Sequence, residues 1–390
     1  MDEQKENRGM IQRATDDNDG DEDRCRQDSL PLDLAMDLLS RLPAKSIARF
    51  LCVSKHWSSF TTVPSFTKSF ATRCSAQPPS LLVTFSKNLK RFVFSFPQDQ
   101  NLDGSYPPVY SYQMTDTDSW CWNHSQSIHG LVLLQGSVIW NPTMRRFSTL
   151  PTPTTNKTVS YLGYDPLEDK HKVLCLSKDE SKQPRVLTLG AQESWRIISK
   201  DFPLHYPYRD CHGQCINGIL YYEACFRIGD GGERRIMSFD VRTEKFDSIE
   251  LPEFYLGSYP HMILYKGRLS IVEIRSLPSI DIWILKDGDS SHKYWKQKRF
   301  NLPLSEIDPI KSKILTFNGV SDTTGELIFT LWRFSDSFWV LYFIMRSESI
   351  REAFFEGVFG DDFRCCYGLD SYGIHSIDVI PNHYESLVSL

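Results

Sequence analysis

Residues 29–60, SLPLDLAMDLLSRLPAKSIARFLCVSKHWSSF, form the stretch of this chain with the most consistent helical signals. They predict three short amphipathic helices. The apolar residues of the second and third of these helices are Ile47, Phe50, Leu51, Val53, Trp57 and Phe60. A helical block this small cannot bury all of its apolar surface within itself, so we expect it to bury the remainder on a partner.

The first helix of the block has clear start and stop signals. Ser29 can cap it, and Pro31 fits its first turn. Pro43 ends it, because a proline disfavours the helical conformation in the residue before it. Leu39 lies beside an apolar stripe whose members recur at every fourth position, namely Leu30, Leu34, Leu38 and Leu42.

This block resembles the F-box, the motif that docks onto the Skp adaptor of cullin–RING ubiquitin ligases. The residues that carry the resemblance are Leu30-Pro31, Leu38, Leu42-Pro43, Ser46-Ile47 and the run from Cys52 to Trp57, CVSKHW. Leu51 departs from the pattern, since many plant members have a basic residue there; this change would alter the rim of the docking surface and leave its apolar anchors. The resemblance implies that the residues binding the Skp adaptor are Leu30, Pro31, Leu34, Leu38, Leu42, Pro43, Ile47, Val53 and Trp57.

A second interpretation of the block remains open. Apolar stripes on helices usually face a core, so the three helices could form an ordinary subdomain packed on the rest of the chain.

Composition limits the class of protein. The chain has 390 residues and 41% hydrophobic residues, which suits about two globular domains. Its net charge of −5 argues against general affinity for nucleic acid or anionic membranes. No apolar run reaches the ~18 residues that span a bilayer. The first ten residues, MDEQKENRGM, lack the apolar core of a secretory signal, so we expect the cytoplasm or the nucleus.

The chain divides into three predicted segments. Residues 1–27 form an acidic leader that we expect to be disordered. Residues 28–75 form the helical F-box domain and include a further short helix over Pro64–Arg73. Residues 76–390 form a mainly β domain, because short runs rich in β-branched and aromatic residues alternate with turn residues. Examples of these runs are Leu81–Phe85, Leu131–Leu134, Ile219–Tyr222 and Ile280–Ile284.

The β region repeats with a period near 50 residues. An aromatic residue or leucine precedes proline at Pro97, Pro151, Pro203, Pro252 and Pro303. Turn glycines recur at Gly218, Gly267 and Gly319, and bulky aromatics at Phe147, Trp195, Phe246 and Trp295. This period is typical of kelch-like blades of four strands, and the length from residue 76 onward suits a β-propeller of about six blades.

Two local features belong to this prediction. Asn217-Gly218 favours a tight hairpin turn with positive φ at both residues. Ile374–Ile380 is a candidate for the strand that closes the ring, so truncation before Gly373 should unfold the domain.

The same region resembles the F-box-associated domain, of the type 3, kelch-like class, found in a large plant family. The matching segments occur in order over residues 130–305, and they are Trp140–Thr143, Leu150-Pro151, Gly163–Pro166, His171–Cys175, Val186–Gly190, Trp195-Arg196, Cys215–Tyr222, Phe239–Phe246 and Tyr265–Gly267. The family implies a target-recognition domain in a ubiquitin-ligase substrate adaptor, without a shared ligand.

No catalytic or metal site is predicted. Cys211 and Cys215, with His212 between them and His205 nearby, offer thiolates and imidazoles, but a structural zinc site needs four ligands and no second pair follows. The ten cysteines lack the spacing of a disulfide-rich secreted domain, so we expect free thiols. Gly229–Gly232 lacks the lysine of a phosphate-binding loop. We therefore expect no cofactor.

The expected function is that of a substrate adaptor in a Skp–cullin–F-box ubiquitin ligase. The F-box would bind a Skp-type adaptor, and through it the cullin and RING subunits, while the β domain would bind a protein target. Candidate target-binding loops are Asp99–Trp122, His205–His212 and Arg227–Glu233, and the sequence does not rank them. Two alternatives stay open: an F-box scaffold that works outside a ligase, and a propeller enzyme that carries a metal.

Overall fold

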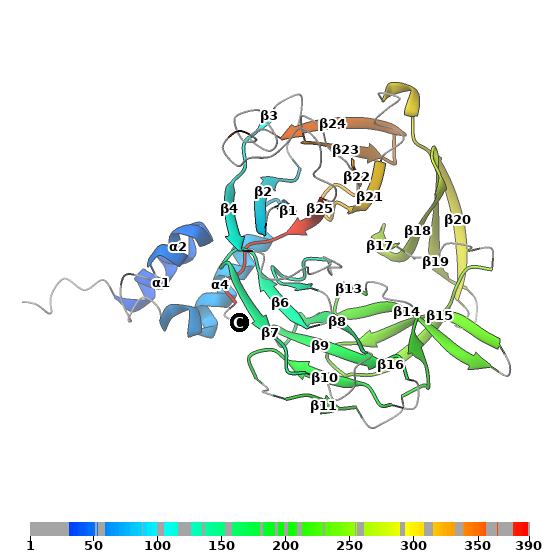
Figure 1. Ribbon diagram of the computed structural model, residues 1–390, viewed down its shortest axis with the longest axis horizontal. Coiled ribbons are helices and arrows are strands. Elements are labelled where there is room, and N and C mark those ends of the chain that lie inside the picture. Colours follow the sequence, from blue (N-terminus) through cyan, green and yellow to red (C-terminus); the bar gives the residue numbers. More distant parts are fainter. Residues whose placement is uncertain are drawn as a thin grey trace, which may run out of the picture.

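The computed structural model describes residues 31–388, apart from residues 51–52, 54–58, 88, 100–104, 116–125, 135–136, 153–157, 180–181, 192–193, 199–201, 209–212, 229–230, 254, 256–260, 289–292, 308–314, 332–337, 356–364 and 366–376. A small helical block lies at one side of a much larger ring of sheets (Figure 1). None of the described helices is long and apolar enough to cross a membrane.

In its described residues the helical block contains three α-helices and one 3₁₀ turn. They are α1 (Leu32–Ser40), α2 (Ala44–Phe50), the 3₁₀ turn η1 (Ser59–Thr62) and α4 (Pro64–Ser75). The predicted helix over Pro64–Arg73 is confirmed, with Pro64 in its first turn. The third predicted helix of the F-box lies largely outside the described residues. A shared core, here called the helical cluster, joins the elements; its buried members are Ala35, Leu39, Ala44, Ile47, Phe60, Phe66, Phe70 and Leu387.

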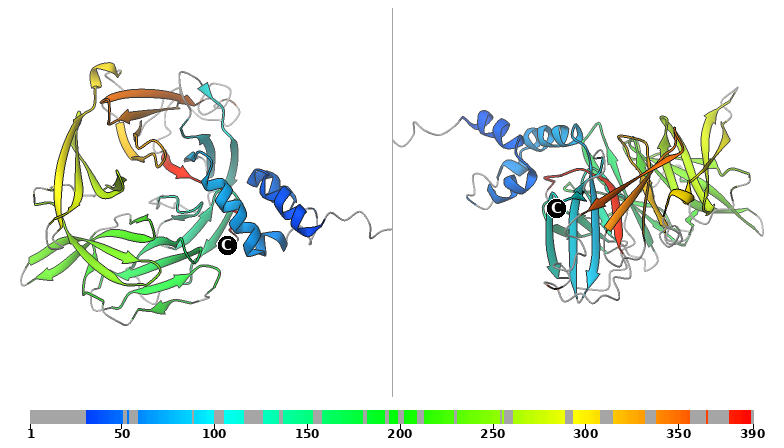
Figure 2. Two further views of the ribbon diagram at one scale, coloured as in Figure 1. Left: turned by 180° about the vertical axis from the view of Figure 1, so that it is seen from behind. Right: turned by 90° about the horizontal axis from the view of Figure 1, so that it is seen from above.

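The sheets form a six-bladed β-propeller, as predicted (Figures 1 and 2). Blade 1 consists of β25 (Asp378–His383), β1 (Ser80–Lys87), β2 (Lys90–Pro97) and β4 (Tyr110–Thr115). Blade 2 consists of β5 (Val132–Leu134), β6 (Val138–Asn141) and β7 (Arg146–Thr149). Blade 3 consists of β8 (Thr158–Asp165), β9 (Lys170–Ser177), β10 (Arg185–Thr188) and β11 (Arg196–Ile197).

Blades 4 and 6 each gain a short extra strand. Blade 4 consists of β12 (Tyr206–Pro207), β13 (Gln214–Ile216), β14 (Ile219–Ile228), β15 (Gly231–Asp240) and β16 (Phe246–Glu250). Blade 5 consists of β17 (His261–Tyr265), β18 (Arg268–Ser276), β19 (Ser279–Asp287) and β20 (Lys293–Asn301). The 3₁₀ turn η3 (Leu304–Glu306) follows it. Blade 6 consists of β21 (Leu315–Val320), β22 (Leu327–Leu331), β23 (Phe338–Ile344), β24 (Ser349–Phe355) and the parallel strand β3 (Ser105–Tyr106). The prediction of four strands in every blade therefore simplifies the described structure, in which blade 2 has three strands and blades 4 and 6 have five.

The core of the propeller lies in the spaces between adjacent blades, here called seams. Each of six buried clusters combines side chains from two neighbouring blades. In β1, for example, Val83 packs between blades 6 and 1, whereas Leu82 packs between blades 1 and 2. Successive side chains of a strand point to opposite faces, and both faces are covered here. For this reason the sequences of the inner strands are continuous apolar runs.

The 50-residue period has identifiable structural causes. The turns Asn217-Gly218 and Lys266-Gly267 both have positive φ at their two residues, which confirms the predicted hairpin geometry. Gly319 is different, because it lies inside β21 at a register shift rather than in a turn. The prediction of a third turn glycine was therefore wrong; this glycine, with φ of +146°, belongs to a bulge.

Two of the four recurring aromatics, both tryptophans, tie neighbouring blades together. Trp195, beside β11, donates its indole N–H to the carbonyl of Pro151 at 2.7 Å, across to blade 2. Trp295 in β20 donates to the carbonyl of Glu250 at 2.7 Å, at the end of blade 4. The same contact is thus repeated two blades along the chain, and it requires an indole at that position.

The last strand closes the ring. β25 pairs antiparallel with β1, so the C-terminal strand becomes the innermost strand of blade 1. Val379 packs between blades 6 and 1, and Ile380 packs between blades 1 and 2. A closing strand near Ile374–Ile380 is confirmed, but it runs over Asp378–His383, and residues 374–376 lie outside the described part.

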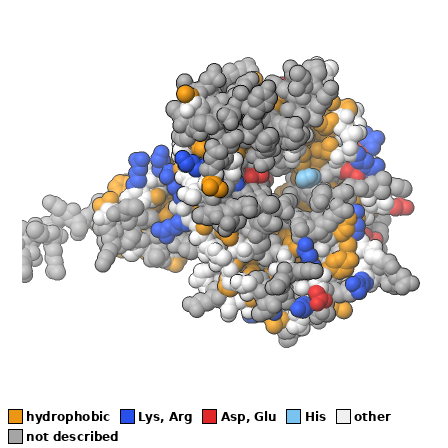
Figure 3. Space-filling view, viewed as in Figure 1, with side chains coloured by type: hydrophobic (Ala, Val, Ile, Leu, Met, Phe, Trp, Pro, Cys, Tyr) orange, Lys and Arg blue, Asp and Glu red, His pale blue; other side chains and the backbone are white. Residues whose placement is uncertain are grey.

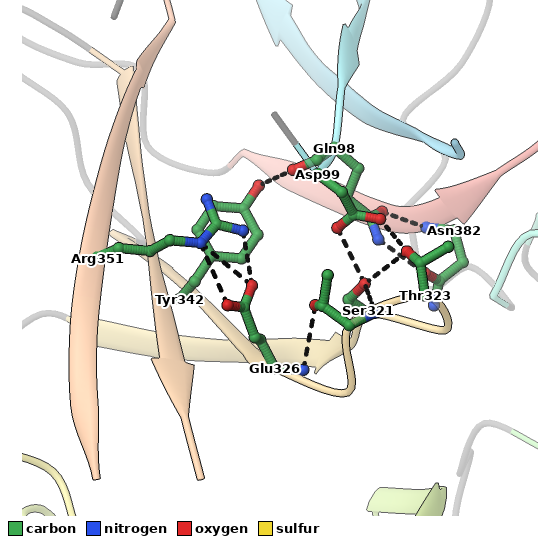
Figure 4. A network of polar contacts seen from close by, with 9 residues as sticks. Gln98, Asp99, Ser321, Thr323, Glu326, Tyr342, Arg351 and Asn382 are labelled. Carbon is green, nitrogen blue, oxygen red and sulfur yellow. Dashed lines mark hydrogen bonds and ion pairs between the residues drawn. The ribbon is translucent and has the colours of Figure 1, made fainter. Parts of the chain in front are cut away.

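Polar contacts around Asn382 fasten this closure (Figure 4). The Asn382 side chain accepts hydrogen bonds from the Gln98 side chain at 2.8 Å and from the backbone N–H of Asp322 at 3.0 Å. It donates to the carbonyl of Val320 at 2.7 Å. Asn382 therefore connects the first blade, the last blade and the closing strand, and its φ of +57° suits asparagine better than most residues.

Replacing Asn382 tests this role. We expect Asn382→Ala to lower the free energy of unfolding by about 3 kcal/mol, because three hydrogen bonds are lost and alanine is strained at positive φ. Asn382→Gly loses the same bonds without the strain and should cost about 1 kcal/mol less. Urea unfolding followed by tryptophan fluorescence gives both values. The control is Asn301→Ala on the exposed outer strand β20; an Asn382→Ala protein as stable as this control would contradict the role.

Candidate functional site

The helical block exposes an apolar surface, here called the docking face. Its members and their exposed fractions are Leu32 (48%), Leu34 (54%), Leu38 (53%), Phe50 (39%) and Val53 (71%). In Figure 3, hydrophobic and basic side chains are visible on the described part of the block, which projects from one side of the propeller. Exposed leucines that cluster on one small unit mark an interaction surface.

Helix periodicity explains why α1 presents leucines on two faces. Leu34 and Leu38 lie one turn apart and point outward, whereas Ala35 and Leu39 are 6% exposed and belong to the helical cluster. Leu42 follows the inner face and packs partly buried against that cluster. The predicted stripe is therefore divided between an inner and an outer face.

The predicted anchors for the Skp adaptor also divide between exposed and buried positions. Pro31, Leu34, Leu38, Pro43 and Val53 are exposed. Ile47 is 1% exposed within the helical cluster, so it supports the helices from inside and has no surface to offer a partner. Leu30 and Trp57 lie outside the described residues.

Charged residues hold and border the docking face. Asp37 of α1 accepts hydrogen bonds from Arg73 of α4 at 2.8 Å and from Arg41 at 2.6 Å. The bond from Arg73, aided by Arg41, lowers the pKa of the Asp37 carboxyl. These contacts orient α1 on α4. Exposed Lys45 and Arg49 on α2 lie on the helix that supplies Phe50, so the rim of the face favours an acidic partner.

Two residues that position this block were missed at the sequence level. Leu387, near the C-terminus, is 2% exposed within the helical cluster, and the Glu385 carboxylate accepts a hydrogen bond from the backbone N–H of Ala44 at 3.0 Å. Glu385, Ser386, Leu387 and Val388 are two polar residues followed by two apolar residues, so the local sequence has no alternation that would indicate a segment with two different faces.

The cysteine and histidine cluster considered for zinc is arranged as core. His205 is 2% exposed and lies between the carbonyl of Pro203, at 2.6 Å, and the hydroxyl of Tyr222, at 2.7 Å. Burial lowers its pKa to about 4. Cys215 accepts a hydrogen bond from the backbone N–H of Tyr164 at 3.4 Å. Cys211 and His212 lie outside the described part of the chain, and the part described holds no group of three or more metal-binding side chains.

The candidate target loops lie partly outside the described residues. Of Asp99–Trp122, Asp99 itself accepts a hydrogen bond from Ser321 at 2.9 Å and belongs to the ring closure. Of Arg227–Glu233, Glu233 accepts one from Arg235 at 2.8 Å within β15. Of the segment that starts at His205, the first residue is buried, as described above. These contacts are structural and leave the choice of loop open.

The two ends of the propeller ring differ. Turns that join the first to the second strand of a blade are short, as at Asn217-Gly218 and Lys266-Gly267. These turns lie at the end of the ring where the C-terminal segment and the helical block join the propeller. Because strands alternate in direction, every connection between blades lies at the opposite end. The strands that precede and follow residues 251–260, 302–314 and 356–377 end and begin there. The helical block therefore joins the propeller at the end opposite to the connections between blades.

Comparisons with known proteins agree with this architecture. Residues 80–384 match the F-box associated beta propeller domain, and residues 28–69 match the F-box domain. The F-box protein At5g18160 of Arabidopsis thaliana is 38% identical over 374 residues, which cover 93% of this chain and 92% of that protein. Another F-box relative from the same plant, At4g21240, is 39% identical over 414 residues, covering 100% of this chain and 97% of the relative.

These matches span nearly the whole chain and join the two parts in the same order. The chain belongs to the F-box proteins that carry an F-box-associated β-propeller domain, a family with many members in Arabidopsis thaliana.

Proposed function

We propose that this protein is the substrate adaptor of a Skp–cullin–F-box ubiquitin ligase. The docking face would bind a Skp-type adaptor, which connects the chain to the cullin and RING subunits, and the propeller would bind a protein target. The observation that carries the proposal is the apolar surface of Leu34 and Leu38, which the rest of the described chain leaves uncovered. Family membership supports the same conclusion.

In this proposal the chain accelerates ubiquitin transfer by proximity alone. Holding a target beside a charged ubiquitin-conjugating enzyme turns an encounter between two molecules into a local step. The chain itself would supply no reacting group. In support, His171, His205 and His383 are buried in the propeller with pKa values lowered by burial, which suits structural histidines better than a proton-transfer site.

The target would bind at the end of the ring that carries the connections between blades. That end is opposite to the one where the chain enters the propeller from α4, so a target there and a Skp-type adaptor on the helical block would bind different parts of the chain. Loops on a rigid scaffold are the usual place for recognition. This placement concerns one end of the ring and assigns no individual loop.

Affinity capture during proteasome inhibition tests the proposal. Wild type and Leu38→Glu are captured in parallel from plant cells, and the proteins bound to each are identified with their ubiquitylated lysines. We expect a Skp-type adaptor and a cullin with wild type only. Targets should bind both forms and carry ubiquitin only with wild type. A wild-type capture that holds the Skp-type adaptor and never the cullin would replace the ligase with a scaffold.

A further inference from the structure

The C-terminal segment Tyr384–Val388 continues the closing strand and runs between the propeller and the helical block. It begins where β25 ends, so its start is held by the β25–β1 ladder. Residues 384–388 belong to no strand, and Ser386 and Leu387 are both buried. These two neighbours contact two different parts of the molecule.

One side of the segment is fixed to blade 2. The Asn141 side chain, which is fully buried, donates hydrogen bonds to the carbonyls of Ser386 at 3.1 Å and Val388 at 2.9 Å. The backbone N–H of Ser386 donates to the hydroxyl of Thr143 at 3.3 Å. Gly130 lies so close that a Cβ placed on it would be 2.3 Å from the Ser386 Cβ. The fit on blade 2 therefore leaves little freedom to slide.

The other side of the segment enters the helical block. Leu387 is buried among the helical cluster, which it joins from outside the block. Glu385 accepts the hydrogen bond from Ala44 at the start of α2. Burial together with the nearby Glu385 raises the pKa of Cys74 in α4 to about 12, so the carboxylate lies near α4 as well. Glu385 and Leu387 thus contact the block while Ser386 and Val388 contact the propeller.

We propose that Tyr384–Val388 is an orientation latch that holds the docking helices at one angle to the propeller. This inference rests on the proposed function, in which the latch would set the position of a bound target relative to the ubiquitin-conjugating enzyme. Glu385 and Leu387 are positioning residues: they would bind neither the Skp-type adaptor nor the target. Without the latch the two domains would be joined chiefly through the chain that leads from α4 into β1 and the Met144 contact, and domains joined by small interfaces move relative to each other.

The first test measures orientation in the isolated chain. Spectroscopic labels are placed at exposed Lys68 in α4 and exposed Leu167 in a blade 3 turn, and the distance distribution between them is recorded. Wild type should give one narrow distribution. Glu385→Ala and Leu387→Ala should each broaden it, by about twofold or more in the double variant, since the domains then reorient. The control Leu204→Ala, at a leucine that is 69% exposed, should leave it unchanged.

The second test measures ubiquitin transfer with the reconstituted ligase, using the lysines of the chain itself as acceptors. Wild type should modify a small set of lysines. The latch variants should modify a wider set while binding the Skp-type adaptor within about twofold of wild type, because the docking face and the latch share no residue. Merely destabilised protein would instead lose binding and show a lower unfolding temperature of the propeller.

The outcomes separate the two proposals. If the latch variants keep the narrow distance distribution of wild type, the latch is refuted. If wild type transfers no ubiquitin while the latch variants broaden the distribution, the latch stands and the ligase function fails. If Leu387→Ala unfolds the helical block, Glu385→Ala decides, because it removes the acceptor of the Ala44 hydrogen bond and leaves Leu387 in the helical cluster.

Discussion

Truncation of the chain before Gly373 should abolish the cooperative unfolding transition of the propeller. The deletion removes β25, the innermost strand of blade 1, and leaves β1 unpaired on one side. It also removes Val379 and Ile380, which fill two different seams. Each of these buried side chains contributes about 1.5–3 kcal/mol, and the ladder and the Asn382 contacts add several hydrogen bonds of about 1 kcal/mol each. That total approaches the 5–15 kcal/mol by which domains are usually stable.

The measurement is thermal unfolding followed by circular dichroism, with limited proteolysis as a second readout. A second truncation, which ends the chain at His383, provides the matched control, because it keeps β25 and removes only the latch. We expect this shorter deletion to retain the transition of the propeller. Two truncated proteins with the same unfolding temperature as the full chain would show that the ring does not depend on its closing strand.

The propeller was predictable because its signal is repeated. Outer-strand tryptophans such as Trp195 and Trp295 recur since the same inter-blade hydrogen bond recurs. Departures from the repeat were not predictable from spacing. Gly319 keeps the period and yet lies in a bulge of β21, because a glycine signals positive φ without distinguishing a turn from a bulge.

The sequence allowed us to predict that the helical block has an apolar docking surface, but not all of the residues that form it. A leucine stripe indicates an amphipathic helix, but it does not say which leucines face inward, since that depends on the elements packed against the helix. Ile47 became core because it joins the helical cluster, whose other members include residues of α1 and α4 and, with Leu387, one from the far end of the chain. No local pattern around residue 47 contains that information. The role of Glu385 was hidden for the same reason, as its partner Ala44 is remote in sequence.

Replacement of Leu38 by glutamate should weaken binding of the Skp-type adaptor by about 100-fold or more, because it places an unpaired charge in the desolvated centre of an interface. Leu38 is 53% exposed in the free chain, so the change should leave the unfolding temperature nearly unaltered. Titration calorimetry with purified adaptor gives the affinity. Leu204→Glu, at an exposed leucine of the propeller, is the matched control and should bind as wild type does.

A second comparison separates loss of the surface from loss of the fold. Leu39 is the neighbour of Leu38, but it is 6% exposed and belongs to the helical cluster. Leu39→Glu would bury a charge inside the block, so it should lose binding because α1 no longer packs, with a matching loss of helical signal. If Leu38→Glu bound the Skp-type adaptor with the affinity of wild type, the outer face of α1 would not be the docking face. Only an outward leucine can lose binding while the block stays folded, and this separation follows from the helical period, which turns Leu39 about 100° away from Leu38 around α1.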